Sequence, residues 1–475
     1  MEEFLKKVAD NLKMKRVEYG DIRIVERESE SIVLKNGVIE AISHDTNIGF
    51  GVRVLKNSAW GFSSSNLIKK SEADKVTKNA LNIARASARV KAKNISLSYL
   101  SPQRGTYHTH VEIDPMAVSL NDKIDLLIAC DKIMRHGNKI KISAAFLEFK
   151  RVKTFFASTD GSLISQEMNF SGGGLHVYAM DSGEMQSRSY EGHRQAGYEF
   201  INSLDLINNA ARITEEVMML QKAKPCPQIE TTVILNEDQM VLQVHESCGH
   251  PTELDRVFGS EASYAGTSFL TLEKLNKFKY GSEVVNIVAD ATIPGGLGTF
   301  GWDDEGVPGQ RTYLVKNGQF VGYLSSRETA NIINTHSSGT MRADGWNRIP
   351  LIRMTNINLE PGNWKLEDMI ADTQDGVFMT TNKSWSIDDK RLNFQFGCEF
   401  ARRIKNGKLT EVHKNPTYAG MTPQFWRNCD AIGDKNSWYL SGTPNCGKGE
   451  PGQIAYVGHG TAPARFRNVH VGIVQ

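Results

Sequence analysis

Cysteine is sparse in this chain of 475 residues, and long apolar runs are absent. The six cysteines are scattered and form no CxxC pair, so we expect reduced thiols in a cytoplasmic protein rather than a disulfide framework. No stretch reaches about 18 uncharged apolar residues, which argues against a transmembrane helix. The N-terminal segment MEEFLKKVADNLKMK is charged throughout, and it therefore lacks the apolar core of a secretory signal.

A strong net charge is also missing. The 56 basic and 54 acidic residues leave a formal charge of +2, so there is no electrostatic footprint for nucleic acid or for an anionic membrane. Hydrophobic residues make up 40% and charged residues 23%, as in soluble globular proteins. The chain is too long for a single core, and two or three domains are expected.

The order of predicted elements indicates an α+β fold. Strand patterns cover 21–27, 31–42 and 49–62, with hairpin turns at Asn36-Gly37, Asp160-Gly161 and Asn317-Gly318. Helical patterns cover 71–90, 119–135 and 203–222. In the first of these, Ser71 and Asp74 resemble a capping box, and the apolar stripe is Val76, Ala80, Ile83 and Val90. The alternation lacks a regular βαβ rhythm, so mixed sheets are favoured over a doubly wound sheet.

The segment QKAKPCPQIE, near 223–230, contains the clearest predicted domain boundary. Its two prolines follow a helical pattern and precede the strand TTVIL, and proline discourages continuation of a helix. We expect an N-terminal α+β domain over 1–225 and a C-terminal domain over 226–475. The C-terminal half is richer in glycine and irregular loops, and we expect it to be rich in β-strands.

The most informative motif is HESCGH, in which His250 follows His245 by five residues. A helix is predicted over 237–248, with Asn236 at its N-cap. On a regular helix, residues five apart point about 140° away from each other and could not hold one metal ion. Gly249 allows a π-turn, or an end to the helix, either of which could bring the rings together. The alternative is two polar residues at a helix end.

Zinc in a catalytic site takes three protein ligands, so a pair of histidines is not sufficient. Cys446 lies in a loop rich in glycine and proline, NCGKGEPGQ, where we expect it to be exposed. A thiolate in such a loop can serve as a metal ligand or as a nucleophile, and the residues themselves leave both roles open.

Six segments in order resemble the TldD/PmbA metalloproteases, and specifically the TldD-like member. They are GFGVRVLKNSAWGF, AKPCP, HESCGH, DDEGVPGQRTYLVKNGQFVGYL, IPLIRMTNINLEPG and NCGKGEPGQ…VGHGTAPARF. The match covers almost the whole chain. One departure lies in the loop between Lys448 and Gln453, which is longer than the family's usual CGK-x-GQ.

This resemblance implies a zinc-dependent peptidase of two domains. The histidines of the family's HExxxH motif and the cysteine of its CGK motif map to His245, His250 and Cys446 as zinc ligands, and Glu246 maps to the general base that activates zinc-bound water. The resemblance also implies a dimer, either of one chain or with a related subunit that lacks the zinc motif. The expected substrates are small or unfolded peptides, which enter an enclosed cavity.

Three further residues are candidates for the site. We consider His459 as an oxyanion-stabilising or substrate-binding residue, against the alternative of an exposed loop histidine. Asp304, within the acidic run 303–305, and Arg353 are further substrate-binding candidates, with a solvated turn and structural packing as their alternatives. The string GLGTFG fits a dinucleotide motif, but no helix pattern follows it, so we reject a nucleotide site.

Two other functions stay open at this point. The chain could be a peptide-binding or regulatory subunit in which zinc is structural, although a structural site needs no base such as Glu246. It could also be a cysteine hydrolase that uses Cys446 with His459. Such an enzyme would be insensitive to chelators and blocked by alkylation.

Overall fold

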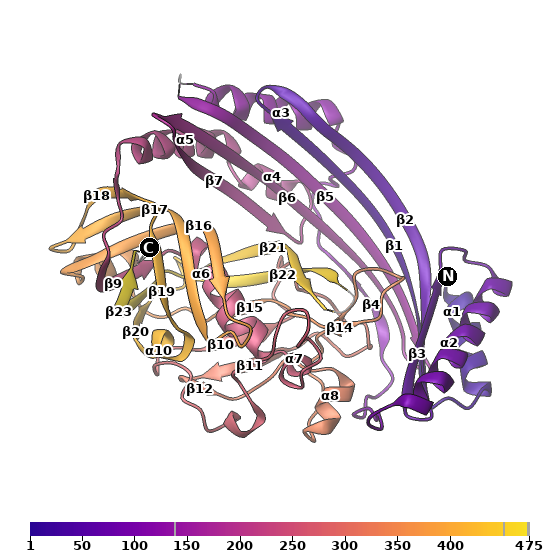
Figure 1. Cartoon of the computed structure of the whole chain (residues 1–475). Helices are drawn as coiled ribbons and strands as arrows, with labels where there is room; N and C mark the ends of the chain where they lie inside the picture. The colour runs from indigo at the N-terminus through magenta and orange to yellow at the C-terminus, as the bar shows by residue number, and fades with distance from the viewer. Residues whose placement is uncertain (137–138, 450–451, 473–475) are drawn as a thin grey trace.

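The computed structural model describes residues 1–136, 139–449 and 452–472. Its N-terminal half is built on one large curved sheet with the order β3-β2-β1-β5-β6-β4, and β7 pairs with β6. Figure 1 shows the long strands arching over the C-terminal half of the chain. The strands are β1 (Tyr19–Lys35), β2 (Val38–Lys56), β3 (Ala59–Ser65), β4 (Arg104–His108), β5 (Ile140–Ser158), β6 (Leu163–Asp181) and β7 (Glu184–Arg194).

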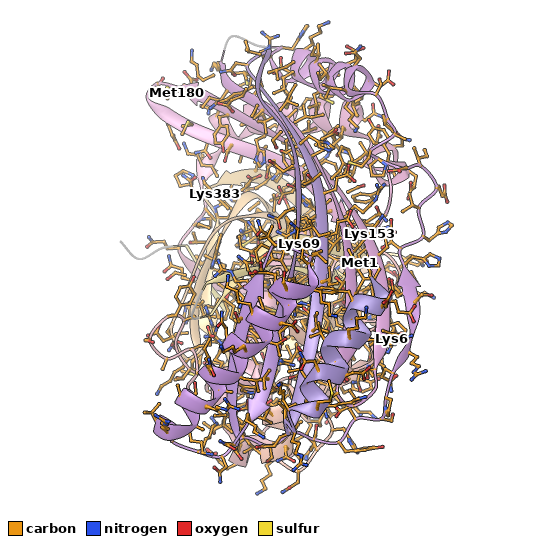
Figure 2. The ribbon with its side chains drawn as sticks, turned by 90° about the vertical axis from the view of Figure 1, so that its right-hand side faces the viewer. Met1, Lys6, Lys69, Lys153, Met180 and Lys383 are labelled. Carbon is orange, nitrogen blue, oxygen red and sulfur yellow. The ribbon has the colours of Figure 1, made fainter. Side chains whose placement is uncertain are left out.

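Helices cover the outer face of this sheet. Along β1, the even-numbered residues Ile22, Ile24, Ile32 and Leu34 are buried beneath helices, because successive side chains of a strand point to opposite faces. The opposite face of β1 points towards the C-terminal half. In Figure 2, α1 and α2 lie in front of the sheet, marked by Lys6 and Lys69. The helices are α1 (Glu2–Met14), α2 (Lys70–Val90), α3 (Leu120–Met134), α4 (Glu199–Ser203) and α5 (Leu206–Lys222).

The C-terminal half contains a second large sheet of eight strands, with the order β16-β9-β23-β19-β17-β18-β8 and β20 beside β23. Most of its apolar residues join one core that also includes the helix before HESCGH. The strands are β8 (Lys224–Pro225), β9 (Ile229–Leu235), β16 (Asp375–Ile387), β17 (Asn393–Lys405), β18 (Lys408–Lys414), β19 (Thr417–Met421), β20 (Cys429–Ile432) and β23 (Ala464–Val471).

Smaller elements surround this sheet and carry the loops of interest. One four-stranded sheet and two hairpins contain β10 (Ile287–Asp290), β11 (Arg311–Lys316), β12 (Gln319–Phe320), β13 (Met341–Arg342), β14 (Leu351–Ile352), β15 (Ile357–Leu359), β21 (Tyr439–Lys448) and β22 (Gln453–Thr461). The helices are α6 (Glu237–Val244), α7 (Leu254–Val257), α8 (Arg327–Ile332), α9 (Leu366–Ala371) and α10 (Thr422–Arg427), with short helical turns η1 (His245–Gly249), η2 (His250–Thr252) and η3 (Leu272–Lys274).

The α+β class with a strand-rich C-terminal half is confirmed. The expected capping box was wrong, because α2 begins after Lys69 and no side chain caps it. Ile83 and Val90 of its expected apolar stripe are 45% and 84% exposed, since only one side of α2 faces the sheet. Within the described residues, no helix combines the length and apolar character needed to cross a membrane.

Candidate metal centre

The motif HESCGH forms the continuation of α6 as a π-helical turn. The α-helix ends at Val244, and residues His245–Gly249 form η1, a turn with i→i+5 bonding. A π-turn has about one residue more per turn than an α-helix, so residues five apart, such as His245 and His250, point to the same side. The rings of His245 and His250 consequently approach each other, with centroids 4.9 Å apart. Of the two geometries expected from the sequence, the π-turn is therefore the one present.

Gly249 serves this turn through its lack of a side chain. Its φ of −73° and ψ of −71° are accessible to other residues, so glycine is not needed here for an unusual backbone. A Cβ atom at this position would lie only 2.1 Å from Sδ of Met354. The tight approach of Met354, which is fully buried, is what requires glycine between the two histidines.

His245, His250 and Cys446 come together as a group able to hold a metal ion, with ligand atoms within 4.8 Å of one another. The Cys446 Sγ lies 3.5 Å from Nε2 of His245 and 3.9 Å from Nε2 of His250. Two ligands of a tetrahedral zinc ion, at about 2.1–2.3 Å, are separated by about 3.6 Å. The donor types and their spacing therefore fit zinc.

A hydrogen bond that His245 donates to His459 sets the orientation of the His245 ring. The Nδ1 of His245 lies 2.8 Å from Nε2 of His459, whose own Nδ1 lies 3.1 Å from the carbonyl of Ile357. Only a protonated Nδ1 of His459 can donate to that carbonyl, so its Nε2 accepts from His245. This assignment leaves Nε2 of His245 with a lone pair that faces Cys446. Burial holds the pKa of His459 well below its usual range, which is consistent with a neutral ring.

Glu253 gives His250 an equivalent partner. Its Oε2 lies 2.9 Å from Nδ1 of His250, which leaves Nε2 of that ring free for the metal. Glu253 is fully buried and forms an ion pair with Lys448 at 3.3 Å. Burial alone would raise the pKa of Glu253, but Lys448 and His250 hold it well below its usual range. The lysine of the CGK segment thus supports a histidine ligand through one carboxylate.

Cys446 is buried, and the expected exposed loop position was wrong. Only 4% of the residue is accessible, and it belongs to β21 at a bulge in the β21–β22 hairpin. Burial alone would raise the pKa of its thiol, but His245 and His250 hold that pKa well below its usual range. Of the lengthened loop between Lys448 and Gln453, residues 450–451 lie outside the described residues.

Glu246 lies next to the metal group and contacts a residue that the sequence gave no reason to select. Its Oε2 accepts a hydrogen bond of 3.1 Å from Nη1 of Arg391, in the loop between β16 and β17. Burial would raise the pKa of Glu246, while His250, His245 and Arg391 together lower it. The carboxylate is therefore available as a proton acceptor beside the three ligand atoms.

The other two candidates lie behind the metal group or far from it. Arg353 is 1% exposed and donates to the backbone carbonyls of Cys446 and Gln453, the latter at 2.9 Å. Asp304 forms a 3.2 Å ion pair with Arg23 of β1 and accepts from the backbone N–H of Ala343 at 2.7 Å. Neither residue lines the main cavity, and His459 does not line it either.

The remaining acids of the DDEG segment also have structural partners. Asp303 accepts bonds of 2.9–3.0 Å from the backbone N–H groups of Glu305, Val307 and Met341. Glu305 forms a buried ion pair with Arg53 of β2 at 3.1 Å. The acidic run therefore joins the loop to the N-terminal sheet, and the solvated turn considered from the sequence is wrong.

The metal group opens onto a large cavity between the two halves of the molecule. Its volume is about 1380 Å³. The walls come from β5, β7 and α5 on one side and from α6, β16, β17, β18 and β21 on the other. His245, Glu246, His250, Arg391 and Cys446 all line it. A volume above that of typical small-ligand sites, about 300–1,000 Å³, suits a peptide of several residues.

Glu253, Lys448 and Arg391 are functional candidates that the sequence analysis did not select. Lys448 was within reach, because it directly follows the ligand segment in CGK. Glu253 lies three residues after His250, a spacing that brings side chains together on a helical turn. Arg391 is 145 residues from Glu246, and no local pattern connects them.

Known proteins match this chain along most of its length. Three family models match the chain, described as PmbA/TldA metallopeptidase domain 1 over 20–84, central domain over 113–219 and C-terminal domain over 228–472. A protein of Methanocaldococcus jannaschii named as a metalloprotease is 33% identical over 93% of this chain and 94% of its own length.

Two further relatives are more distant. A protein of Buchnera aphidicola named as a metalloprotease TldD homolog is 27% identical over 98% of this chain and 94% of its own length. The crystal structure of TldE from Thermococcus kodakarensis has the same fold, with a TM-score of 0.79 and 16% identity over 99% of this chain and 100% of that one. The C-terminal family model alone spans more than half of the chain, and this protein belongs to the PmbA/TldA metallopeptidase family.

Proposed function

We propose that this protein is a zinc-dependent peptidase that hydrolyses small or unfolded peptides inside the cavity. The observation that carries the proposal is the convergence of His245, His250 and Cys446 beside Glu246 on the cavity wall. Two nitrogens and one thiolate suit zinc, and three protein ligands leave one position for water. A structural zinc site would instead be closed by four protein ligands.

Zinc bound here would polarise the peptide carbonyl and lower the pKa of a water molecule. Glu246 would accept a proton from the attacking water and would later transfer that proton to the departing amine. His459 and Glu253 hold the two histidine rings in their ligand tautomers. In this proposal Arg353 holds the Cys446 backbone, and neither Arg353, Asp304 nor His459 contacts the substrate.

The shape of the cavity wall supports an extended peptide as substrate. Strand β21 pairs with β22 on one edge, and no other strand pairs with it among the described residues. Tyr439 and residues 441–447 of this strand line the cavity, and Cys446 is one of them. A free strand edge binds an extended peptide through main-chain hydrogen bonds. Folded proteins cannot present such a segment, so unfolded chains and short peptides are favoured.

We also propose that residues 1–225 enclose the substrate and provide the dimer surface, while residues 226–475 carry the chemistry. The β1–β2 hairpin supports this division, because Val38–Ile48 of β2 is exposed throughout and no strand pairs with its outer edge within the described residues. Val38, Ile39 and Ile42 are 67%, 40% and 46% exposed. Such an edge favours pairing with another chain, either a second copy or a subunit related to TldE, and we propose that the assembly works in the cytoplasm.

Metal analysis combined with peptide cleavage tests this function. The purified protein should contain about one zinc per chain and cleave an unfolded protein such as reduced, alkylated casein. A chelator should stop cleavage, and added zinc should restore it. Glu246→Gln should retain zinc and lose cleavage, whereas a protein that binds peptide through structural zinc would show no cleavage before the substitution.

The same experiment distinguishes a cysteine hydrolase. A hydrolase that used Cys446 with His459 would cleave in the presence of chelator. In such a hydrolase Cys446 would not bind zinc, so Cys446→Ser would leave the zinc content of the protein unchanged. Zinc-free protein with undiminished cleavage would refute the peptidase mechanism proposed here.

A further inference from the structure

Arg391 is a cationic side chain that contacts Glu246 of the HESCGH segment at the cavity wall. Its side chain is 14% exposed, and its Nη1 lies 3.1 Å from the carboxylate of Glu246. Arg391 lines the same cavity as the three ligand residues. A positive group at this position faces the place where a substrate carbonyl must lie if Glu246 is to deliver a proton to the adjacent amine.

The other arginines of the cavity have established partners elsewhere. Arg188 pairs with Glu216 and Glu399, Arg212 pairs with Glu216, and Arg402 donates to the carbonyl of Thr410. Within the described residues, the guanidinium of Arg391 donates to Glu246 through Nη1, and its buried Nε has no acceptor. A guanidinium group has five N–H donors, so Arg391 has donors available for a ligand.

The backbone around Arg391 fixes its position. Its φ of 63° lies in the left-handed region, which costs free energy for a residue with a side chain. The N–H of Arg391 donates to the carbonyl of Asp388 at 2.9 Å, and Thr422 donates to the carbonyl of Arg391 at 2.9 Å. The carboxylate of Asp388 also accepts from the N–H of Leu392 at 2.8 Å. Strain held by such a network is typical of functional loops.

We propose that Arg391 is a catalytic residue that donates hydrogen bonds to the substrate carbonyl oxygen as negative charge develops on it. This inference rests on the proposed peptidase function. As the water oxygen bonds to the carbonyl carbon, its proton passes to Glu246 and the π electrons of the carbonyl move to its oxygen. Glu246 thereby becomes neutral and binds Arg391 less strongly, while the new oxyanion attracts it. Collapse re-forms the carbonyl, breaks the C–N bond and returns the proton from Glu246 to the amine.

The role assigned to Arg391 is one that sequence reasoning considered for His459. His459 cannot fill it, because the ring is fully buried, has its Nδ1 near the Ile357 carbonyl and its Nε2 near His245. Arg391 instead combines positive charge, a free donor and access to the cavity. Loss of one donor to an oxyanion typically reduces kcat about 100-fold to 1,000-fold.

Arg391→Gly is the most informative variant, because glycine adopts a φ of 63° without strain and leaves space for a soluble guanidinium ion. With zinc-loaded protein and casein peptides, we expect kcat to fall about 100-fold with a small change in KM. Methylguanidinium should restore part of kcat. Arg311→Ala, which removes an arginine paired with Glu360 outside the cavity, should retain normal kcat.

A second measurement separates donation to the oxyanion from mere orientation of Glu246. A phosphinic peptide mimics the tetrahedral intermediate, and the matching amide peptide mimics the substrate. The affinity of both ligands is measured in two zinc-loaded proteins, the Glu246→Gln variant and the double variant Glu246→Gln/Arg391→Gly. Loss of Arg391 should weaken phosphinate binding about 50-fold or more and amide binding only a few-fold. Equal weakening of both ligands overturns the proposal.

These outcomes distinguish the two levels of inference. Normal kcat in Arg391→Gly, with zinc-dependent cleavage intact in the parent protein, refutes the role of Arg391 and leaves the peptidase function standing. A parent protein that binds zinc but neither cleaves peptides nor prefers the phosphinate over the amide refutes both. A third outcome is a reduced kcat that methylguanidinium does not restore, with no selective loss of phosphinate binding. This result would assign Arg391 a structural role only, and it also overturns the proposal.

Discussion

His459 and His245 are joined ring to ring, with Nε2 of His459 2.8 Å from Nδ1 of His245. The same Nδ1 could not also face Cys446, so this bond determines which nitrogen of His245 is available to a metal. His459 is therefore a support for a ligand, and its position explains why it does not line the cavity.

His459→Phe should lower zinc affinity about 10-fold to 100-fold, because the new ring cannot accept from His245. Competition with a chromophoric chelator measures the affinity, and His470→Ala, at a histidine ring that is 74% exposed, is the control. Unchanged zinc affinity with reduced kcat would instead return His459 to the oxyanion role.

Gly249→Ala should distort the π-turn, since its Cβ would lie 2.1 Å from Sδ of Met354. Overpacking of this kind costs about 1–3 kcal/mol of unfolding free energy, and displacement of His250 should weaken zinc binding. Denaturant unfolding and zinc titration measure the two effects. Adding Met354→Ala removes the clash, and it should recover zinc affinity; no recovery would place the cause elsewhere.

Asp304→Asn should leave KM and kcat unchanged, because its carboxylate contacts Arg23 and the Ala343 backbone rather than the cavity. It should lower the melting temperature, since Arg23 is almost fully buried and would lose its charged partner. Steady-state kinetics and thermal unfolding measure both quantities. A rise in KM of about five-fold or more without a loss of stability would support the substrate-binding role considered from the sequence.

Lys150 gives the protein a pH-dependent stability. Burial, with Arg27 nearby, lowers its pKa to about 7, while the unfolded chain has a lysine pKa of about 10.4. Between these two values the unfolded state binds more protons, so this lysine makes stability rise as the pH increases from about 7 to about 10. Below pH 7 its destabilising effect is fully present.

Lys150→Met should therefore raise the melting temperature at pH 7 by about 1–2 °C, and the gain should shrink as the pH approaches 10. Thermal unfolding of both proteins between pH 7 and 10 gives the difference directly. A gain that stays constant over this range would show that the pKa of Lys150 is not lowered. Lys153→Met, on the same strand and 37% exposed, is the matched control.

Ile42→Lys should convert a dimer into a monomer if the β1–β2 hairpin is the partner surface. A lysine on an exposed strand edge opposes pairing with another chain, and the side chain is 46% exposed, so the fold should be retained. Sedimentation of the parent and the variant at equal concentration measures the change. A parent that is already monomeric alone, yet dimeric with a TldE-related subunit, would identify the partner as that subunit.

The sequence by itself determined the elements that depend on local periodicity and turn chemistry. The expected helices at 71–90, 119–135 and 203–222 match α2, α3 and α5 closely, and the turn at Asn36-Gly37 has positive φ at both residues. The two histidines and Glu246 belong to one short segment, so their selection also needed no tertiary information. Cys446 entered as one of two possibilities from the residues and as a ligand only through the family resemblance.

Only the tertiary structure decided which distant residues complete the site. Cys446 lies 196 residues from His250, and its burial depends on pairing between β21 and β22 and on Arg353 behind it. His459, Glu253 and Arg391 acquire their roles through single hydrogen bonds, which depend on atomic positions within a few tenths of an ångström. Periodicity and composition carry no information at that scale, and Asp304 and Arg353, selected on motif alone, were accordingly found in structural ion pairs and backbone contacts.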